Sequence, residues 1–195
     1  MSAANSQNTI KKIRIKFDIF ELNLLTMKKL TFLLAFMLCI FIAKAQKAEQ
    51  QIDKLMTSWH QAAAKADFNG YFGLLHDKSI YMGTDATERW TKSEFINFAK
   101  PYFDRGRAWD FTAVDRHIAF SKDGNTAWVD EILDTKNMSL CRGSGVLVKD
   151  NGKWQIVQYV LSMTVPNDLA NDVTKQKTPD EVRVLKDFQN KKPLK

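Results

Sequence analysis

The residues of this chain best suited to chemistry are two adjacent carboxylates, Asp130 and Glu131. They lie in a run with the two-residue alternation of a β-strand, where neighbours point to opposite faces, so at most one can enter a pocket. A pocket carboxylate could act as a general base or anchor a ligand, and burial would raise its pKa. The alternative is a structural ion pair, with Arg142 on the next predicted strand as the partner of Glu131. Asp130 and Glu131 are the candidate catalytic residues, and the structural role stays open.

Aromatic side chains supply the second chemical feature. Most of them must belong to the core, because a domain of this size needs their apolar surface. Two or three lining a cavity would suit an apolar or aromatic small molecule held by a few polar anchors. The candidate ligand-binding residues are Trp59, Tyr81, Trp90, Trp109, Glu131, Arg142 and Tyr159.

Other chemistries lack their patterns. His60, His76 and His117 are scattered without metal-ligand spacing, so we expect no metal site and no cofactor. The run Gly143–Gly145 is flanked by residues that fit neither a nucleophile elbow nor a dinucleotide fingerprint. A bend in the sheet, or the close approach of a ligand, explains such small residues in a strand. Cys141 is interpreted as a buried strand residue in preference to a reactive thiol.

The elements that must position these residues follow from hydrophobic periodicity. We expect a helix over residues 48–66, a short helix from Tyr71 to about Asp77, a strand over 79–82, and a helix opened by the capping box Thr91–Glu94. The period then changes to two and predicts strands over 109–120, 126–134, 140–149 and 154–164, joined by short turns. Helices followed by an antiparallel meander indicate an α+β fold.

The last 30 residues, 166–195, are predicted to be a C-terminal tail. A second capping box, Thr178–Glu181, with proline at the first helical position, predicts a short docked helix there. A frayed tail is the alternative, because the neighbouring residues are polar.

Residues 27–45 have the pattern of a secretory signal peptide. Lys28 and Lys29 precede an apolar run of about 14 residues, which is too short to span a bilayer, and Ala43–Ala45 forms a small-x-small cleavage site. The alternative is a membrane anchor. We expect cleavage after Ala45 and export to the periplasm or the medium, with no stable membrane anchor afterwards. Residues 1–26 are interpreted as an upstream extension, with Met27 as the start; a long n-region is the alternative.

Removal of the leader changes the composition. Its seven Lys/Arg and two Asp/Glu lower the formal net charge from +7 to +2 when they leave. A nearly neutral domain lacks the electrostatic footprint of a nucleic-acid-binding protein. Cys39 leaves as well, so Cys141 stands alone and no intramolecular disulfide is expected. Residues 46–195 are long enough for one domain with a single core.

Several short segments of the mature region resemble one family in their order and spacing. They are Trp59–Ala63, Thr87–Trp90, Ala127–Glu131 with Leu133–Thr135, Cys141–Leu147, and Gly152–Ile156 leading to Leu161–Ser162. Together they cover about residues 48–163, and the region resembles a SnoaL-like domain of the nuclear transport factor 2-like superfamily.

The resemblance implies a cone-shaped barrel over residues 46–165, with N-terminal helices packed in a curved antiparallel sheet, also called cystatin-like. It implies a pocket between sheet and helices and homodimers formed through the outer sheet face. The superfamily includes isomerases, dehydratases, polyketide cyclases and binding modules, so the fold does not choose an activity. Related domains often carry histidine on the last strand, where this chain has Gln158 and Val160.

We therefore expect an exported domain that binds a small, largely apolar molecule, as a homodimer and without nucleic acid. One alternative is an isomerase, dehydratase or cyclase in which Asp130 or Glu131 is the base and Tyr81 or Tyr159 donates to a developing oxyanion. The other is a dimeric interaction module whose cavity is filled by its own side chains.

Overall fold

The structure is a computed structural model that describes residues 36–37 and 46–191. Apart from Phe36 and Met37, the predicted leader and the extension before it lie outside the described residues. Among the described residues, no helix combines the length and apolar character that crossing a membrane requires.

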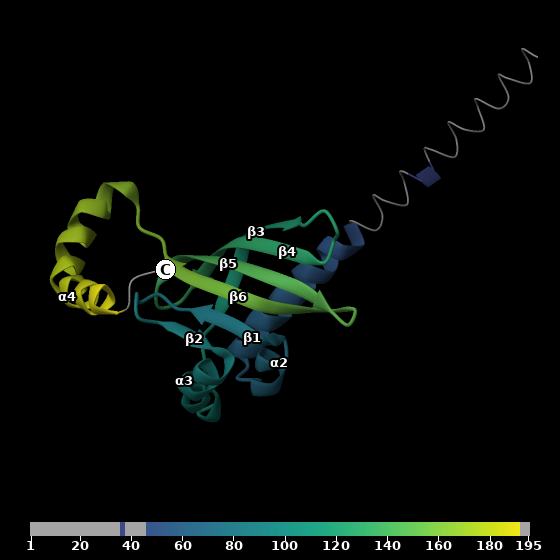
Figure 1. The fold of residues 1–195 in the computed structure, drawn as a ribbon, viewed down its shortest axis with the longest axis horizontal. Helices are drawn as coiled ribbons and strands as arrows, with labels where there is room; N and C mark the ends of the chain where they lie inside the picture. Colours follow the sequence, from purple (N-terminus) through teal and green to yellow (C-terminus); the bar gives the residue numbers. More distant parts are fainter. Residues whose placement is uncertain (1–35, 38–45, 192–195) are drawn as a thin grey trace, which may run out of the picture. The chain divides into compact units, whose positions relative to one another are not determined.

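The N-terminal helix covers residues 46–64, close to the predicted 48–66. Its apolar stripe is buried: Ile52, Met56, Trp59 and Ala63 are each at most 1% exposed. Such a stripe at three- and four-residue spacing must face a partner surface. That surface is the concave face of the sheet, because the stripe shares one core with strand residues. In Figure 1 this helix runs behind strands β5 and β6.

Six strands form one curved sheet in the order β2-β1-β6-β5-β4-β3. Their bounds are Leu75–Met82 (β1), Arg89–Thr91 (β2), Phe111–Phe120 (β3), Thr126–Thr135 (β4), Ser139–Asp150 (β5) and Lys153–Met163 (β6). Strands β3 to β6 form the predicted antiparallel meander. The sheet is mixed, however, because β1 pairs with β6 in parallel. No hairpin links these two distant segments, so local pattern left their direction undetermined.

The β5–β6 connection shows how sequence sets register locally. Asn151 and Gly152 have φ angles of +48° and +79°. Positive φ at both central residues is typical of the turns that join two-residue hairpins, and asparagine and glycine adopt it most readily. This hairpin places Gly143 opposite Leu161 and Gly145 opposite Tyr159.

Helix α3 (Lys92–Asp104) begins at the predicted capping box. Thr91 is the N-cap, its hydroxyl accepts from the Glu94 N–H, and the Glu94 carboxylate accepts the Thr91 N–H at 2.8 Å. Pro101 lies inside the helix without ending it, and the helix stops at Arg105, before Gly106 with φ +71°.

The short helix predicted after the N-terminal helix has different limits in the structure. Helix α2 covers Phe68–Phe72 and not Tyr71 to Asp77, because the Asp67 side chain caps it by accepting the Gly70 N–H at 2.9 Å. The residues from Leu75 onward join β1 instead.

The C-terminal helix is longer than predicted. A 3-10 turn, η1 (Asn167–Leu169), leads into α4 (Ala170–Asn190), none of whose residues is buried. Thr178 is not an N-cap: its hydroxyl donates to the Thr174 carbonyl at 2.7 Å, within a helix already formed, and Pro179 lies inside that helix.

Candidate functional site

A cavity of about 670 Å³ opens between helix α3, the β1–β2 hairpin and the segment that leads into β3. This volume lies within the range of ligand pockets. Seven of the 18 lining residues are aromatic: Tyr81, Trp90, Phe95, Phe98, Tyr102, Trp109 and Phe111. The wall also includes Ala64 from the N-terminal helix, Met138 and Leu161.

The aromatic rings of one wall are nearly parallel. Tyr81 and Phe95 stack with centroids 4.0 Å apart and planes 12° apart. Trp90 stacks on Phe98 at 4.5 Å and 21°, and Phe95 lies 5.7 Å from Trp109 at 22°. Rings stacked in this way cover part of one another's faces and form one rigid aromatic wall, against which a flat apolar ligand can pack.

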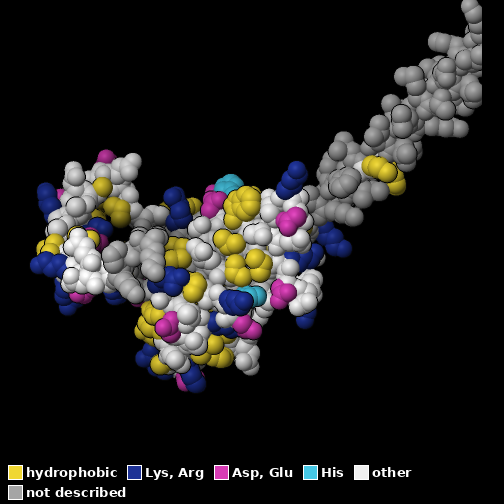
Figure 2. Space-filling view, in the orientation of Figure 1, with side chains coloured by type: hydrophobic (Ala, Val, Ile, Leu, Met, Phe, Trp, Pro, Cys, Tyr) yellow, Lys and Arg dark blue, Asp and Glu magenta, His cyan; other side chains and the backbone are white. Residues whose placement is uncertain are grey.

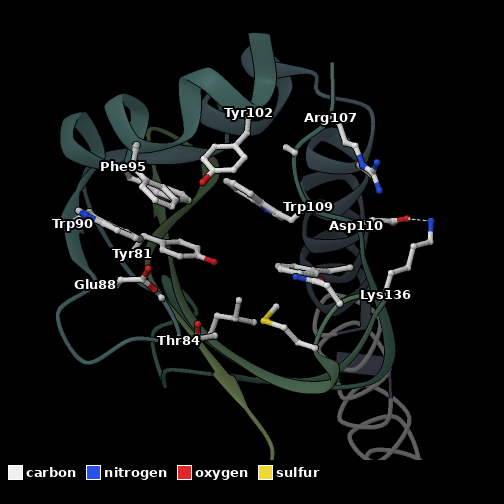
Figure 3. Close-up of a pocket in the computed structure, with 18 residues that line it drawn as sticks. Tyr81, Thr84, Glu88, Trp90, Phe95, Tyr102, Arg107, Trp109, Asp110 and Lys136 are labelled. Atoms are coloured by element: carbon white, nitrogen blue, oxygen red, sulfur yellow. Dashed lines mark hydrogen bonds and ion pairs between the residues drawn. The ribbon is translucent and has the colours of Figure 1, made fainter. Parts of the chain in front are cut away.

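Four charged residues line the same cavity. Asp110 and Lys136 form an ion pair of 2.6 Å between exposed side chains, and such a pair contributes little to the stability of the fold. Glu88 is half-buried and lies beside Tyr81 and Trp90, whereas Arg107 lies across the cavity with the Asp110–Lys136 pair (Figure 3). Burial raises the pKa of Tyr81, and the nearby Glu88 charge raises it further, so its hydroxyl is a neutral hydrogen-bond donor.

Glu131 is the centre of a second, separate cluster beneath the sheet's concave face. Its side chain is fully buried, and it does not line the cavity. Oε1 accepts the Tyr159 hydroxyl at 2.7 Å and lies 2.8 Å from His60 Nε2, which must donate because a carboxylate has no proton. Oε2 accepts Arg116 Nε at 2.7 Å. Both carboxylate oxygens are therefore satisfied.

Arg116 links this cluster to the N-terminal helix. Its Nη1 donates to the Asp53 carboxylate at 2.7 Å and to the Thr57 hydroxyl at 2.9 Å. Its Nη2 is buried without a hydrogen-bond partner among the described residues. The Glu131 cluster, which we define as His60, Arg116, Glu131 and Tyr159, thus joins helix, β3, β4 and β6.

The surroundings of Glu131 keep it ionised. Burial acts to raise its pKa, but the hydrogen bond and charge of His60, the charge of Arg116 and the Tyr159 hydrogen bond outweigh it and lower the pKa to about 2. A base works best with a pKa near the working pH, so this carboxylate is a poor general base.

Gly143 makes this arrangement possible. It lies opposite Glu131 on β5, and a Cβ there would overlap the Tyr159 hydroxyl and lie 3.0 Å from Glu131 Cγ. Glycine therefore leaves the space in which Tyr159 reaches Glu131. The glycine run flagged in the sequence is explained by packing of the protein's own side chains.

The predicted site residues separate into three groups. Tyr81, Trp90 and Trp109 line the cavity. Trp59, Tyr159 and Glu131 lie in the core beside it, where Trp59 packs edge-on against Tyr159 with centroids 4.7 Å apart. Asp130 and Arg142 are exposed on the outer face.

The predicted ion pair between Glu131 and Arg142 is wrong. Arg142 is in register with Ile132, one residue away from Glu131, so the two side chains point to opposite faces. The partner is Arg116, on the other neighbouring strand. A bulge between Ala113 and Asp115 shifts the alternation of β3 and turns Arg116 inward.

Sequence reasoning missed several residues of the cavity and of the Glu131 cluster. His60 is four residues after Met56 and therefore lies near the buried stripe, which is the signal that could have placed it in the core. Phe95, Phe98 and Tyr102 belong to the helix that the capping box predicts, but no pattern in the sequence placed a cavity beside that helix. Among the described residues, no group of three or more His, Cys, Asp or Glu is placed to hold a metal ion.

Solved structures with this fold come from several bacteria. A protein of unknown function from Pseudomonas putida KT2440, described as NTF2-like, is 15% identical with a TM-score of 0.54, covering 63% of this chain and 90% of that one. An NTF2-like protein from Cytophaga hutchinsonii is 17% identical with a TM-score of 0.50, covering 60% and 98%. A Nostoc punctiforme protein with a cystatin-like fold is 15% identical with a TM-score of 0.50, covering 60% and 90%.

At these identities the likeness shows the fold alone: an α+β NTF2-like fold with a curved mixed sheet. No curated protein matches this chain significantly. The model of the SnoaL-like domain family, however, matches residues 52–166, which is more than half of the chain. These residues contain the N-terminal helix from its second turn, the whole sheet and every residue of the cavity and the Glu131 cluster. The chain belongs to the SnoaL-like domain family.

Proposed function

We propose that this domain binds a small, largely apolar molecule in its aromatic cavity. The observation that supports this most is the cavity of about 670 Å³, left open by the core side chains and walled by rings with parallel faces. A core built only for stability fills such space, because interiors pack to crystal-like density. An open cavity also argues against a module whose cone is filled.

Binding is supported better than catalysis by the two carboxylates first considered. Glu131 is outside the cavity, both of its oxygens are occupied, and its pKa is lowered to about 2. Asp130 is exposed on the opposite face of the sheet. A general base must come within hydrogen-bond reach of its substrate, and neither residue meets that requirement in this cavity.

We further propose that two copies pair through the outer face of the sheet. Trp128 is 48% exposed there, and half-buried Ile132, Val146 and Val160 lie on the same face; we call these four the outer-sheet patch. Trp128 is in register with Val146, whereas Val160 is in register with Ser144 and Ile132 with Arg142, so the patch extends across β4 to β6 with polar residues between its members. Figure 2 shows hydrophobic side chains gathered over these strands. Apolar side chains gathered on one face suit a partner surface.

The third part of the proposal is export, with removal of residues 1–45. It rests on the sequence pattern of residues 27–45 alone. One measurement tests all three parts. Native mass spectrometry of the protein purified from its own host is expected to give a dimer of chains that begin at Gln46 and carry a retained small molecule. A ligand-free monomer that keeps its leader would contradict each part separately.

Prediction one blocks the cavity. Ala64 lines it from an exposed position on the N-terminal helix, so Ala64→Trp should place a ring in the space without disturbing the core. We expect the affinity for the neutral fluorescent dye prodan, measured by titration, to fall at least about tenfold, the equivalent of 1.4 kcal/mol.

The matched control is Gln61→Trp, on the same helix, exposed and outside the cavity lining. It should bind the dye as the unmodified protein does. Equal affinity in all three proteins would show that the dye binds elsewhere, and no binding by any of them would overturn the proposal for this class of ligand.

A further inference from the structure

The β1–β2 hairpin brings an acidic group to the aromatic wall. Tyr81 is in register with Trp90, and the Gly83 N–H donates to the Glu88 carbonyl at 3.0 Å. Tyr81 and Trp90 are paired and share a face of the hairpin, and Glu88, the residue before β2, lines the same cavity.

Gly83 gives the Glu88 side chain its place. A Cβ at Gly83 would overlap the Glu88 carboxylate, so glycine leaves the carboxylate free to lie over the backbone. Glu88 Oε2 accepts the Asp85 N–H at 3.1 Å, and Oε1 has no hydrogen-bond partner among the described residues. Glu88 also forms no ion pair with any Lys, Arg or His of the described residues. Asp110, the other carboxylate of the lining, is neutralised by Lys136.

An unneutralised carboxylate beside electron-rich rings is an arrangement suited to a cation. The faces of tryptophan and tyrosine attract cations through their quadrupoles, most strongly when water is displaced. Glu88 adds a full negative charge at the edge of the same wall. The one cation of the lining without an ion pair among the described residues, Arg107, is exposed on the other side of the cavity (Figure 3).

We propose that the ligand is flat and carries an amine or other cationic group, which Glu88 binds beside Tyr81 and Trp90. This rests on the proposed function and names the chemical class of its ligand. Glu88 is the specificity-determining residue, and the stacked rings hold the flat part of the ligand in a single orientation.

Three probes with one carbon frame test the proposal. They are naphthalen-2-ylmethylamine, the neutral 2-naphthalenemethanol and the anionic 2-naphthoate, each titrated calorimetrically at pH 7. We expect the amine to bind about tenfold more tightly than the alcohol, because cation–π and carboxylate contacts each contribute modestly, and the naphthoate to bind most weakly. This comparison needs no variant, so it does not depend on whether a mutant folds.

Glu88→Gln then identifies the residue responsible. Its amide oxygen can still accept the Asp85 N–H, so the loop keeps its shape while the charge is lost. We expect the tenfold preference for the amine to disappear in this variant and to persist in Asp110→Asn, which removes the other carboxylate of the lining.

The outcomes separate the two proposals. If all three probes bind but the naphthoate binds most tightly, or if Glu88→Gln keeps the preference for the amine, the inference is overturned and the binding function stands. If none of the probes binds, the binding function itself fails for flat aromatic ligands, and this inference fails with it.

Discussion

At the scale of single residues, Glu131 is the buried centre of a hydrogen-bonded cluster. Its carboxylate receives three hydrogen bonds from His60, Arg116 and Tyr159, each on a different element. A buried ion pair gains little over an apolar pair, but losing one partner strands the other charge in the core. The cluster therefore fixes how the helix sits in the sheet more than it adds to stability.

Prediction two concerns this cluster. Glu131→Gln keeps the size of the side chain but replaces one acceptor by an NH2 group that faces a donor, and it leaves Arg116 with less compensating charge. We expect the free energy of unfolding, from urea titration near pH 7, to fall by about 3 kcal/mol.

Asp130→Asn is the matched control, because Asp130 is the exposed neighbour on the same strand. It should change the free energy of unfolding by less than about 0.5 kcal/mol. A loss below about 1 kcal/mol in Glu131→Gln would contradict this role of the cluster.

At the scale of elements, helix α3 builds one side of the cavity wall. It supplies Phe95, Phe98 and Tyr102, and its start is fixed by the reciprocal hydrogen bonds of Thr91 and Glu94. Thr91 and Glu94 are only three positions apart in the chain, so the sequence was enough to predict where this helix begins. Capping depends on neighbours in the chain, which a sequence displays directly.

Prediction three removes the cap. Thr91→Ala deletes the hydroxyl that accepts the Glu94 N–H, so one backbone donor of the first turn loses its partner. We expect the free energy of unfolding to fall by about 1 kcal/mol in urea titration. Ser93→Ala, at an exposed position of the same turn, should have a smaller effect. Alanine has the higher helix propensity, so propensity alone predicts no loss in either variant, and an equal loss in both would contradict a specific role for the Thr91 cap.

The elements whose limits were wrong had competing local signals. Thr178–Glu181 has the residue types of a capping box, but the chain is already helical from Ala170, and the Thr178 hydroxyl bonds back to Thr174. Tyr71 to Leu75 looks apolar enough for a helix, yet Leu75 pairs with Ile156 of β6. In the second case a contact between distant segments overrode the local preference, as strand pairing commonly does.

At the scale of the whole molecule, the charge of Glu131 links folding to pH. Its pKa falls from 4.5 to about 2 in the folded protein. A group with a lowered pKa stabilises the fold fully above its unfolded pKa, and that contribution is lost as the pH falls toward the folded pKa. The contribution should therefore disappear between about pH 5 and pH 2.

Prediction four follows from this linkage. The shift in pKa corresponds to about 3 kcal/mol at 1.36 kcal/mol per unit. Urea titrations at several pH values should show the difference in unfolding free energy between the unmodified protein and Glu131→Gln shrinking as the pH is lowered from 5. Asp77, Asp85, Glu94 and Asp123 also have lowered pKa values, but all four are present in both proteins and cancel in the difference. A difference that stays constant with pH would contradict the role given to Glu131.

The sequence by itself determined the fold class, the four-stranded meander and the capped helix. Each depends on residues close together in the chain: the period of apolar residues, turn dipeptides and caps. The family resemblance came from the order and spacing of short segments over residues 48–163. The strand alternation also showed that only one of Asp130 and Glu131 could face inward. The structure shows that this residue is Glu131.

Only the tertiary structure decided what Glu131 does and where the cavity lies. Arg116, His60 and Tyr159 are 15, 71 and 28 residues from Glu131 in the chain. A bulge in β3, which the sequence pattern did not predict, turns Arg116 inward. The register of β5 on β4 places Arg142 on the outer face. The parallel pairing of β1 with β6 carries the β1–β2 hairpin, and Glu88 with it, to the cavity. Long-range register sets these positions, and register depends on packing against the whole core.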